Sequence, residues 1–244
     1  MTRPVLLVAG GSRGIGAAIA KLAGASGYDV AVNYRNNEKA AQEVVAAVNA
    51  AGGQALAIKG DMGDEGDIER VFKAAETLGS ITHFVHSSGI TGNASRLDAV
   101  SAATVREVLD VNTFGAIWCL RAALLRMSTK NDGKGGAIVM ITSMAATIGG
   151  AGEYTWYAAA KGAVNTLVVG AAREVAKEGV RINGVSPGLI DTEIHAPGRL
   201  ERVTPFIPMG RPGSAGEVAQ TVMFLLSDAA SYITGSIINV SGAR

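Results

Sequence analysis

The chain has 244 residues, of which 48% are hydrophobic, and its formal net charge is +1. This length and composition predict one large domain with a sizeable core. The charges are scattered and form no basic stripe, so we do not expect nucleic acid as a partner. The lone cysteine, Cys119, predicts a buried thiol rather than a disulfide, and the apolar run at the start is too short for a signal peptide, so we expect a cytoplasmic protein with no membrane contact.

Short apolar runs alternate with helical patterns along the whole chain. The predicted strands cover 4–10, 29–34, 54–61, 81–89, 136–143, 180–188 and 236–242. The predicted helices cover 14–26, 38–52, 64–79 with Asp64 as N-cap, most of 101–129, 155–178 and 215–231, and a Pro/Gly-rich loop covers about 187–213. This alternation predicts a single α/β domain over 1–244, with a doubly wound parallel sheet covered by helices on both faces. Ligands of such folds bind beyond the carboxyl ends of the strands.

The glycine-rich turn "GGSRGIG" joins the first predicted strand to its helix. Gly10, Gly14 and Gly16 let the chain turn tightly, and the free N–H groups of the helix N-terminus suit a pyrophosphate. The same stretch also fits a Gly-x-Ser-x-Gly nucleophile elbow, with Ser12 as nucleophile. Asp61 or Asp191, followed by His195, would complete that hydrolase in the right order. Such an elbow normally follows several strands, whereas this turn follows the first.

The end of the second predicted strand bears on the choice of nucleotide. An NAD site usually places Asp or Glu there to hold the ribose 2′-hydroxyl. Here the residues are Asn33, Tyr34 and Arg35, with no carboxylate. Arg35 and Arg13 can together neutralise a 2′-phosphate, which predicts NADP(H) in preference to NAD(H). The alternative is that both arginines only cover the surface.

Two tyrosines, Tyr154 and Tyr157, precede Lys161 in "EYTWYAAAK". Tyr157 is four residues from Lys161 and shares a helix face with it, whereas Tyr154 is two turns away, about 10.5 Å along the axis. A phenol has a pKa of about 10, and a nearby ammonium lowers it toward the range useful for proton transfer. Alone, this pair is typical of a solvated helix face. Ser143 at the end of the fifth strand can hold a carbonyl, and Asn112 can hold a water that relays protons to Lys161.

These residues together resemble the short-chain dehydrogenase/reductase family over nearly the whole chain. The matching positions are "GGSRGIG" (10–16), Asp61 in "GDM", Asn112, Ser143, Tyr157, Lys161 and Pro187-Gly188 followed by Thr192. The pattern is most similar to oxoacyl-carrier-protein reductases and sugar dehydrogenase-like members. The resemblance implies one Rossmann domain with a seven-stranded parallel sheet, a homotetramer, and hydride transfer between NAD(P) and a small carbonyl or alcohol substrate.

The resemblance also implies a role for each matching residue. Tyr157 is the expected acid–base, Ser143 the carbonyl ligand, Lys161 the pKa modifier and ribose ligand, and Asn112 the water holder. The expected cofactor ligands are Gly10, Ser12, Arg13, Gly14, Ile15, Gly16, Tyr34, Arg35, Asp61, Met62, Ser88, Gly89, Tyr157, Lys161, Pro187, Gly188, Ile190 and Thr192. The expected substrate wall is Ser143, Met144, Ala145, Tyr154 and Tyr157. No cluster has metal-ligand spacing, so we expect no metal.

One position and one four-residue stretch depart from the family pattern. Ala9 stands where the family usually has Thr, and His86-Ser87-Ser88-Gly89 replaces the usual Asn-Asn-Ala-Gly. We expect these changes to affect local stability and cofactor affinity more than chemistry, with His86 paired to backbone rather than to a metal or a substrate.

Two further questions stay open. A non-catalytic NADP(H)-binding sensor is the alternative function, but such proteins typically lose the Tyr or the Lys, and both are present. The loop segment 189–211 is expected to close over the substrate, and its charges, Glu193, His195, Arg199 and Arg202, are either substrate ligands or a solvated face.

Overall fold

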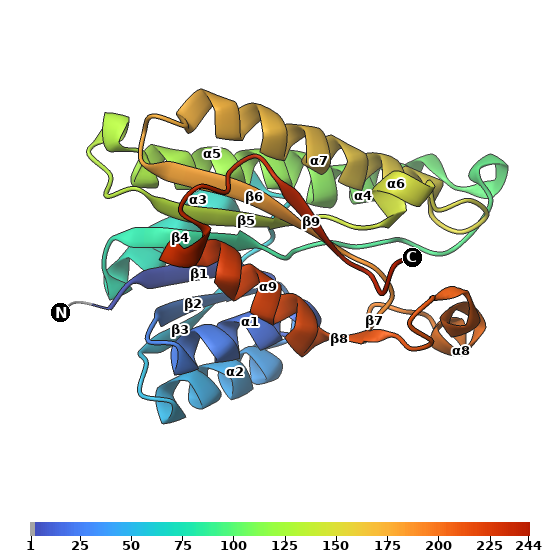
Figure 1. Cartoon of the computed structure of the whole chain (residues 1–244), viewed down its shortest axis with the longest axis horizontal. Helices are drawn as coiled ribbons and strands as arrows, with labels where there is room; N and C mark the ends of the chain where they lie inside the picture. The colour runs from blue at the N-terminus through green and yellow to red at the C-terminus, as the bar shows by residue number, and fades with distance from the viewer. Residues whose placement is uncertain (1–2) are drawn as a thin grey trace.

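The computed structural model describes residues 3–244 and has a seven-stranded parallel sheet at its centre, in the order β3-β2-β1-β4-β5-β6-β9 (Figure 1). The strands are β1 (Val5–Ala9), β2 (Asp29–Tyr34), β3 (Ala55–Lys59), β4 (Ile81–His86), β5 (Gly136–Ile141), β6 (Val180–Pro187) and β9 (Ile237–Val240). The predicted doubly wound α/β fold is therefore confirmed. The predicted fifth strand is too long, because pairing ends at Ile141 and Ser143 lies beyond it.

Helices cover both faces of this sheet (Figure 1). One face carries α1 (Gly14–Ala25), α2 (Glu38–Ala50) and α9 (Ala215–Leu226), and the other carries α3 (Glu65–Ala75), α4 (Ala102–Leu109), α5 (Gly115–Met127) and α7 (Thr155–Val175). An apolar cluster fills each interface, and all five residues of β1 are buried. This two-sided burial explains why the strands are continuously apolar rather than alternating.

Local sequence sets the helix starts. Asp64 is the N-cap of α3, as predicted, and its side chain accepts a hydrogen bond from the Asp67 N–H at 2.8 Å. Ser214 and Glu217 form a capping box at the start of α9. By contrast, Arg13 is the N-cap of α1, and its side chain makes no capping hydrogen bond to the described residues. The first N–H groups of α1 are therefore available to a ligand.

The predicted helical stretch 101–129 is interrupted by a π turn at Asp110–Phe114. Gly115 follows this turn because a Cβ there would lie 1.9 Å from the Met62 carbonyl oxygen. By length and composition alone, Ala102–Met127 could cross a membrane, with a mean hydropathy of 1.4 in its most apolar window. Half of that window is buried in the fold, as expected for a helix that packs on a sheet.

Residues 189–211, which we call the lid segment, contain more regular structure than the sequence predicted. β7 (Ile190–Asp191) pairs in parallel with β8 (Gly213–Ser214), and α8 (Arg199–Val203) lies between them in sequence. These elements form a small lobe beyond the carboxyl end of the sheet (Figure 1).

A second short helix, α6 (Ala145–Ile148), was also not predicted. The last predicted helix is shorter than expected, because α9 ends at Leu226 and Ser227 is extended.

The strand order reverses between β1 and β4, which lie side by side with Ala9 opposite His86. The loops after these two strands diverge to opposite faces and leave a crevice. Such a switch point is where doubly wound sheets bind ligands.

Candidate active site

A cavity of about 650 Å³ lies along the carboxyl ends of the strands. The sequence-predicted residues that line it are Gly10, Ser12, Arg13, Gly14, Ile15, Tyr34, Arg35, Asp61, Met62, Ser88, Gly89, Ser143, Met144, Ala145, Tyr154, Tyr157, Lys161, Pro187, Gly188, Ile190 and Thr192. Two predicted residues, Gly16 and Asn112, are buried behind the wall instead. The fold therefore brings segments from both halves of the chain to one site.

The glycine-rich turn has the shape that a pyrophosphate needs. Gly10 and Gly14 have φ of 73° and 51°, in the left-handed region that favours glycine. A Cβ on Gly10 would lie 2.8 Å from the Ser88 nitrogen. Gly16 does not line the cavity. Glycine is needed there because a Cβ would lie 2.1 Å from the Gly10 oxygen, so its absence lets the helix pack against the turn. With the exposed N–H groups of α1, this turn fits a dinucleotide.

Asn33 supports this turn, a role that the sequence did not reveal. Its Oδ1 accepts from the Gly10 N–H at 3.1 Å, and its Nδ2 donates to the carbonyls of Ile58 and Gly60 at 3.3 and 3.0 Å. The buried amide thus ties together the ends of β1, β2 and β3. A polar residue at a buried strand end was the only signal that could have found it.

Arg35 and Asp61 pair with each other beyond the ends of β2 and β3. Arg35 Nε lies 2.9 Å from Asp61 Oδ2, and both side chains are partly exposed. Asp61 Oδ1 also accepts from the Gly63 N–H at 2.9 Å. The carboxylate therefore orients Arg35 as well as its own loop.

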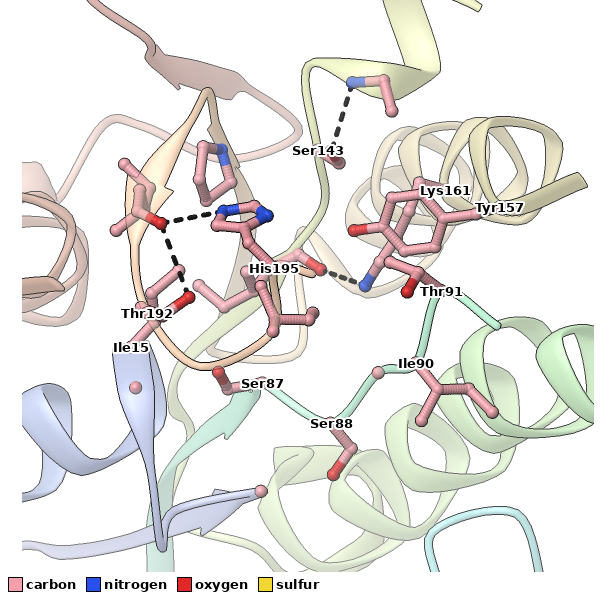
Figure 2. A pocket seen from close by; sticks show the side chains of 18 of the residues that line it. Ile15, Ser87, Ser88, Ile90, Thr91, Ser143, Tyr157, Lys161, Thr192 and His195 are labelled. Atoms are coloured by element: carbon pink, nitrogen blue, oxygen red, sulfur yellow. Dashed lines mark hydrogen bonds between the residues drawn. The ribbon is translucent and has the colours of Figure 1, made fainter. Parts of the chain in front are cut away.

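Ser143, Tyr157 and Lys161 lie together at the centre of the cavity (Figure 2). Ser143 Oγ accepts from the Ala145 N–H at 3.1 Å, and Lys161 Nζ donates to the Ile141 carbonyl at 2.9 Å and lies 5.9 Å from the Tyr157 ring centroid. Burial lowers the pKa of Lys161 to about 8. Burial also raises the pKa of Tyr157, against the opposing effects of the Ser143 hydroxyl and the Arg199 guanidinium.

Asn112 is fully buried in the π turn, and its side chain binds backbone. Its Oδ1 accepts from the Ile90 N–H at 2.9 Å, and its Nδ2 donates to the Ile90 carbonyl at 2.7 Å. It lies close to Lys161, since a Cβ on Gly89 would be 2.9 Å from Asn112 Oδ1 and 3.4 Å from Lys161 Nζ. The side chain thus holds the 89–91 loop against the lysine.

The prediction that His86 pairs with backbone is wrong. Neither ring nitrogen has a hydrogen-bond partner among the described residues, although the side chain is buried. The ring packs edge-on against Phe84, with 6.4 Å between centroids. Burial, and to a smaller extent the charge of Lys161, lowers the pKa of His86 to about 3. An imidazole replaces the family's usual amide here, in a space without a matching polar group.

Two charged side chains of the lid segment, Arg199 and Arg202, pair with Glu153 in the loop before α7. Arg199 Nε and Nη2 donate to Glu153 Oε2 at 3.2 and 2.9 Å, and Arg202 also pairs with Glu153. Arg199 Nη1 donates to His195 Nδ1 at 3.2 Å, and His195 Nε2 donates to the Ile190 carbonyl at 2.9 Å. Arg199 also lies over the Tyr154 ring, 5.5 Å from its centroid. Of the four lid charges, His195 and Arg199 are partly buried at the cavity wall, whereas Glu193 and Arg202 are exposed.

The serine hydrolase alternative fails on this geometry. Asp61 is occupied by Arg35 and the Gly63 N–H. His195 uses one ring nitrogen for Ile190 and the other for Arg199. Among residues 3–244 no cluster of three or more His, Cys, Asp or Glu side chains could hold a metal ion.

The sequence is similar to those of known reductases. The family model described as Enoyl-(Acyl carrier protein) reductase matches residues 9–242. The chain is 36% identical to 3-oxoacyl-[acyl-carrier-protein] reductase of Synechocystis, over 99% of this chain and 97% of that protein. The chain belongs to the short-chain dehydrogenase/reductase family. It is therefore an oxidoreductase whose family uses a nicotinamide cofactor.

Other members of the family are similar over comparable lengths. An uncharacterized oxidoreductase of Escherichia coli, YgfF, is 45% identical over 98% of this chain and 99% of its own length. L-rhamnose 1-dehydrogenase (NAD(P)(+)) of Sphingomonas is 37% identical over 97% of this chain and 94% of its own length. A solved short-chain dehydrogenase/reductase from Serratia marcescens superposes with a TM-score of 0.92 at 31% identity, covering 98% of this chain and 97% of that one. The relatives thus include both a reductase and a sugar dehydrogenase.

Proposed function

We propose that this protein is an NADP(H)-dependent oxidoreductase that transfers hydride between the nicotinamide and a carbonyl or alcohol substrate. The observation that carries the proposal is the meeting of Ser143, Tyr157 and Lys161 in one cavity with the glycine-rich turn. When bound, a nicotinamide would supply or take the hydride, and its oxidised form would carry a positive charge. Side chains of the protein hold the substrate and move the proton.

Ser143 and Tyr157 hold the substrate oxygen, and Tyr157 donates a proton during reduction or accepts one during oxidation. We propose that Lys161, which Ile141 holds with its ammonium 5.9 Å from the Tyr157 ring centroid, favours the phenolate against the burial that raises the pKa of Tyr157. We propose that Asn112 keeps the 89–91 loop and a relay water beside Lys161, through which the proton on Tyr157 is replaced. Its buried position next to Lys161 supports this role.

The NADP(H) preference rests on Arg35 and Arg13 at the adenosine end. Both line the cavity, and Arg35 is half-exposed, so its guanidinium is within reach of a 2′-phosphate. Asp61 partly neutralises Arg35, so we expect NADP(H) to bind more tightly than NAD(H) without excluding NAD(H) from the site. Ile190 and Thr192 also line the cavity, with Thr192 next to Gly14 of the glycine-rich turn, and we propose that they hold the carboxamide.

We also propose a homotetramer in the cytoplasm. On the outer face of α5, Ile117 and Leu125 are 40% and 46% exposed on either side of the exposed Arg121, and the burial of these two apolar side chains against a second copy supports this proposal. Light scattering after size exclusion gives the mass directly. A monomer at micromolar concentration contradicts this part of the proposal.

The central test is Tyr157→Phe, which removes one hydroxyl. Turnover of a carbonyl and alcohol panel, followed by nicotinamide absorbance with NADPH and NADH in parallel, should fall about 100- to 10,000-fold. Nucleotide binding, measured by fluorescence, should stay close to wild type. Tyr232→Phe is the matched control, because Tyr232 is fully exposed and outside the cavity. A Tyr157→Phe variant that keeps its rate refutes the assignment.

A further inference from the structure

Positive charge exceeds negative charge at the substrate end of the cavity. The guanidiniums of Arg199 and Arg202 pair with one carboxylate, Glu153, and Arg244 lines the same cavity. Burial raises the pKa of Glu153, but hydrogen bonds from Arg202 and Arg199 outweigh this effect and keep the carboxylate ionised. His195 adds no charge at neutral pH, because burial and the Arg199 guanidinium lower its pKa. The three guanidiniums face two carboxylates, Glu153 and the terminal carboxylate of Arg244 itself, so one positive charge remains in excess at this wall.

The nearby lid carboxylates do not compensate for it. Glu193 also lines the cavity, but its Oε2 lies against the glycine-rich turn, 3.7 Å from the position of a Cβ on Gly14. Asp191 is exposed and acts on His195 from outside the cavity. Burial and the Arg199 guanidinium both lower the pKa of Arg244, which indicates that two cations share a partly desolvated space. Such a pair favours an anion between them.

The two arginines also have donors to spare. Arg199 uses three of its five N–H groups, two toward Glu153 and one toward His195. The Arg244 guanidinium makes no hydrogen bond to any described residue, while the carboxylate of this last residue accepts weakly from Ser241 Oγ at 3.4 Å. Both side chains line the same cavity as Ser143 and Tyr157. Planar guanidiniums bind carboxylates through paired hydrogen bonds.

Arg199 is close to the reacting groups. It lies over Tyr154, immediately before α7, and its charge lowers the pKa of Tyr157, three residues later. An anion bound by Arg199 is therefore near the position of the carbonyl that Ser143 and Tyr157 hold. Glu153 acts as a positioning residue, because its salt bridge fixes Arg199 at the cavity wall.

We propose that the substrate carries a carboxylate, which Arg199 and Arg244 bind while Ser143 and Tyr157 hold its carbonyl or hydroxyl oxygen. This inference rests on the proposed function and narrows its substrate to oxo acids and hydroxy acids. A substrate with a short carbon chain suits this part of the cavity, because Met144, Ala145 and Tyr154 also line it.

The test compares 2-, 3- and 4-oxo carboxylic acids with their methyl esters, which match them in shape but lack the charge. With NADPH, the kcat/KM of at least one acid should exceed that of its ester by about tenfold or more, as expected for a charge-assisted hydrogen bond. Arg244→Gln should remove most of this difference by raising the KM of the acid, with little change for the ester. Arg199→Gln should do the same, and Arg199→Lys should keep part of the difference. Arg96→Gln, an exposed arginine outside the cavity, is the control and should behave as wild type.

Equal kcat/KM for acids and esters in the wild type, or an acid preference that survives both glutamine variants, overturns the inference. Since Arg199 also holds the lid, Arg244→Gln keeps the test decisive if Arg199→Gln unfolds. Turnover of esters and other neutral carbonyls without an acid preference refutes this inference and leaves the proposed function standing. No turnover of any carbonyl or alcohol with either cofactor refutes both.

Discussion

His86→Leu measures the cost of the buried imidazole at the end of β4, whose ring nitrogens have no partner among residues 3–244. The side chain is 1% exposed, and its pKa in the fold is about 3. A histidine in the unfolded chain titrates near pH 6.5, so between about pH 6.5 and 3 the unfolded state binds a proton that the folded state does not. Stability therefore falls as the pH drops through this window. At pH 5, about 1.5 below the unfolded-state pKa, the loss is about 2 kcal/mol.

Urea unfolding of the wild type and of His86→Leu at pH 7 and pH 5 checks this magnitude. The wild type should lose about 2 kcal/mol more than the variant between these pH values, because leucine binds no proton. At pH 7 the variant should be at least as stable as the wild type, since it removes two buried polar atoms that have no partner in the described part of the chain. His83, whose pKa burial lowers to about 4, is present in both proteins and cancels in the comparison. Equal losses in the two proteins would show that the fold does not hold His86 neutral.

Three further changes probe the turn, a helix cap and the nucleotide end. Gly16→Ala places a Cβ 2.1 Å from the Gly10 oxygen and should cost about 1–3 kcal/mol in urea unfolding, whereas Gly170→Ala, with no described atom within 4 Å, should gain about 0.5–1 kcal/mol. Ser214→Ala removes the capping box of α9 and should cost about 1 kcal/mol in the same assay. Arg35→Ala should lower the ratio of kcat/KM for NADPH to that for NADH about tenfold. An unchanged ratio would contradict the assignment of Arg35 to the 2′-phosphate, and equal stabilities of the two glycine variants would contradict the packing of the turn.

The sequence alone determined the fold class and the order of the elements. Buried strands read as continuous apolar runs, and helices begin at local caps such as Asp64, so both signals lie within a few residues. The same holds for Tyr157 and Lys161, because helical spacing places residues four apart on one face. Element ends were less accurate: Ser143 lies beyond β5, and a π turn interrupts the helical stretch before α5, because packing of distant segments decides both.

The tertiary structure alone decided which charged and polar groups meet. Arg199 and Glu153 are 46 positions apart, and their salt bridge depends on how the lid segment folds back over the loop before α7. The pairing of Arg35 with Asp61 and the contacts of Asn33 with three strand ends depend likewise on strand order. His86 illustrates the limit most clearly, because its hydrogen-bonding groups are visible in the sequence and their lack of partners among the described residues is visible only in the packed structure. Local periodicity records a residue's own backbone geometry, whereas burial and partners are set by chain segments that the local sequence does not contain.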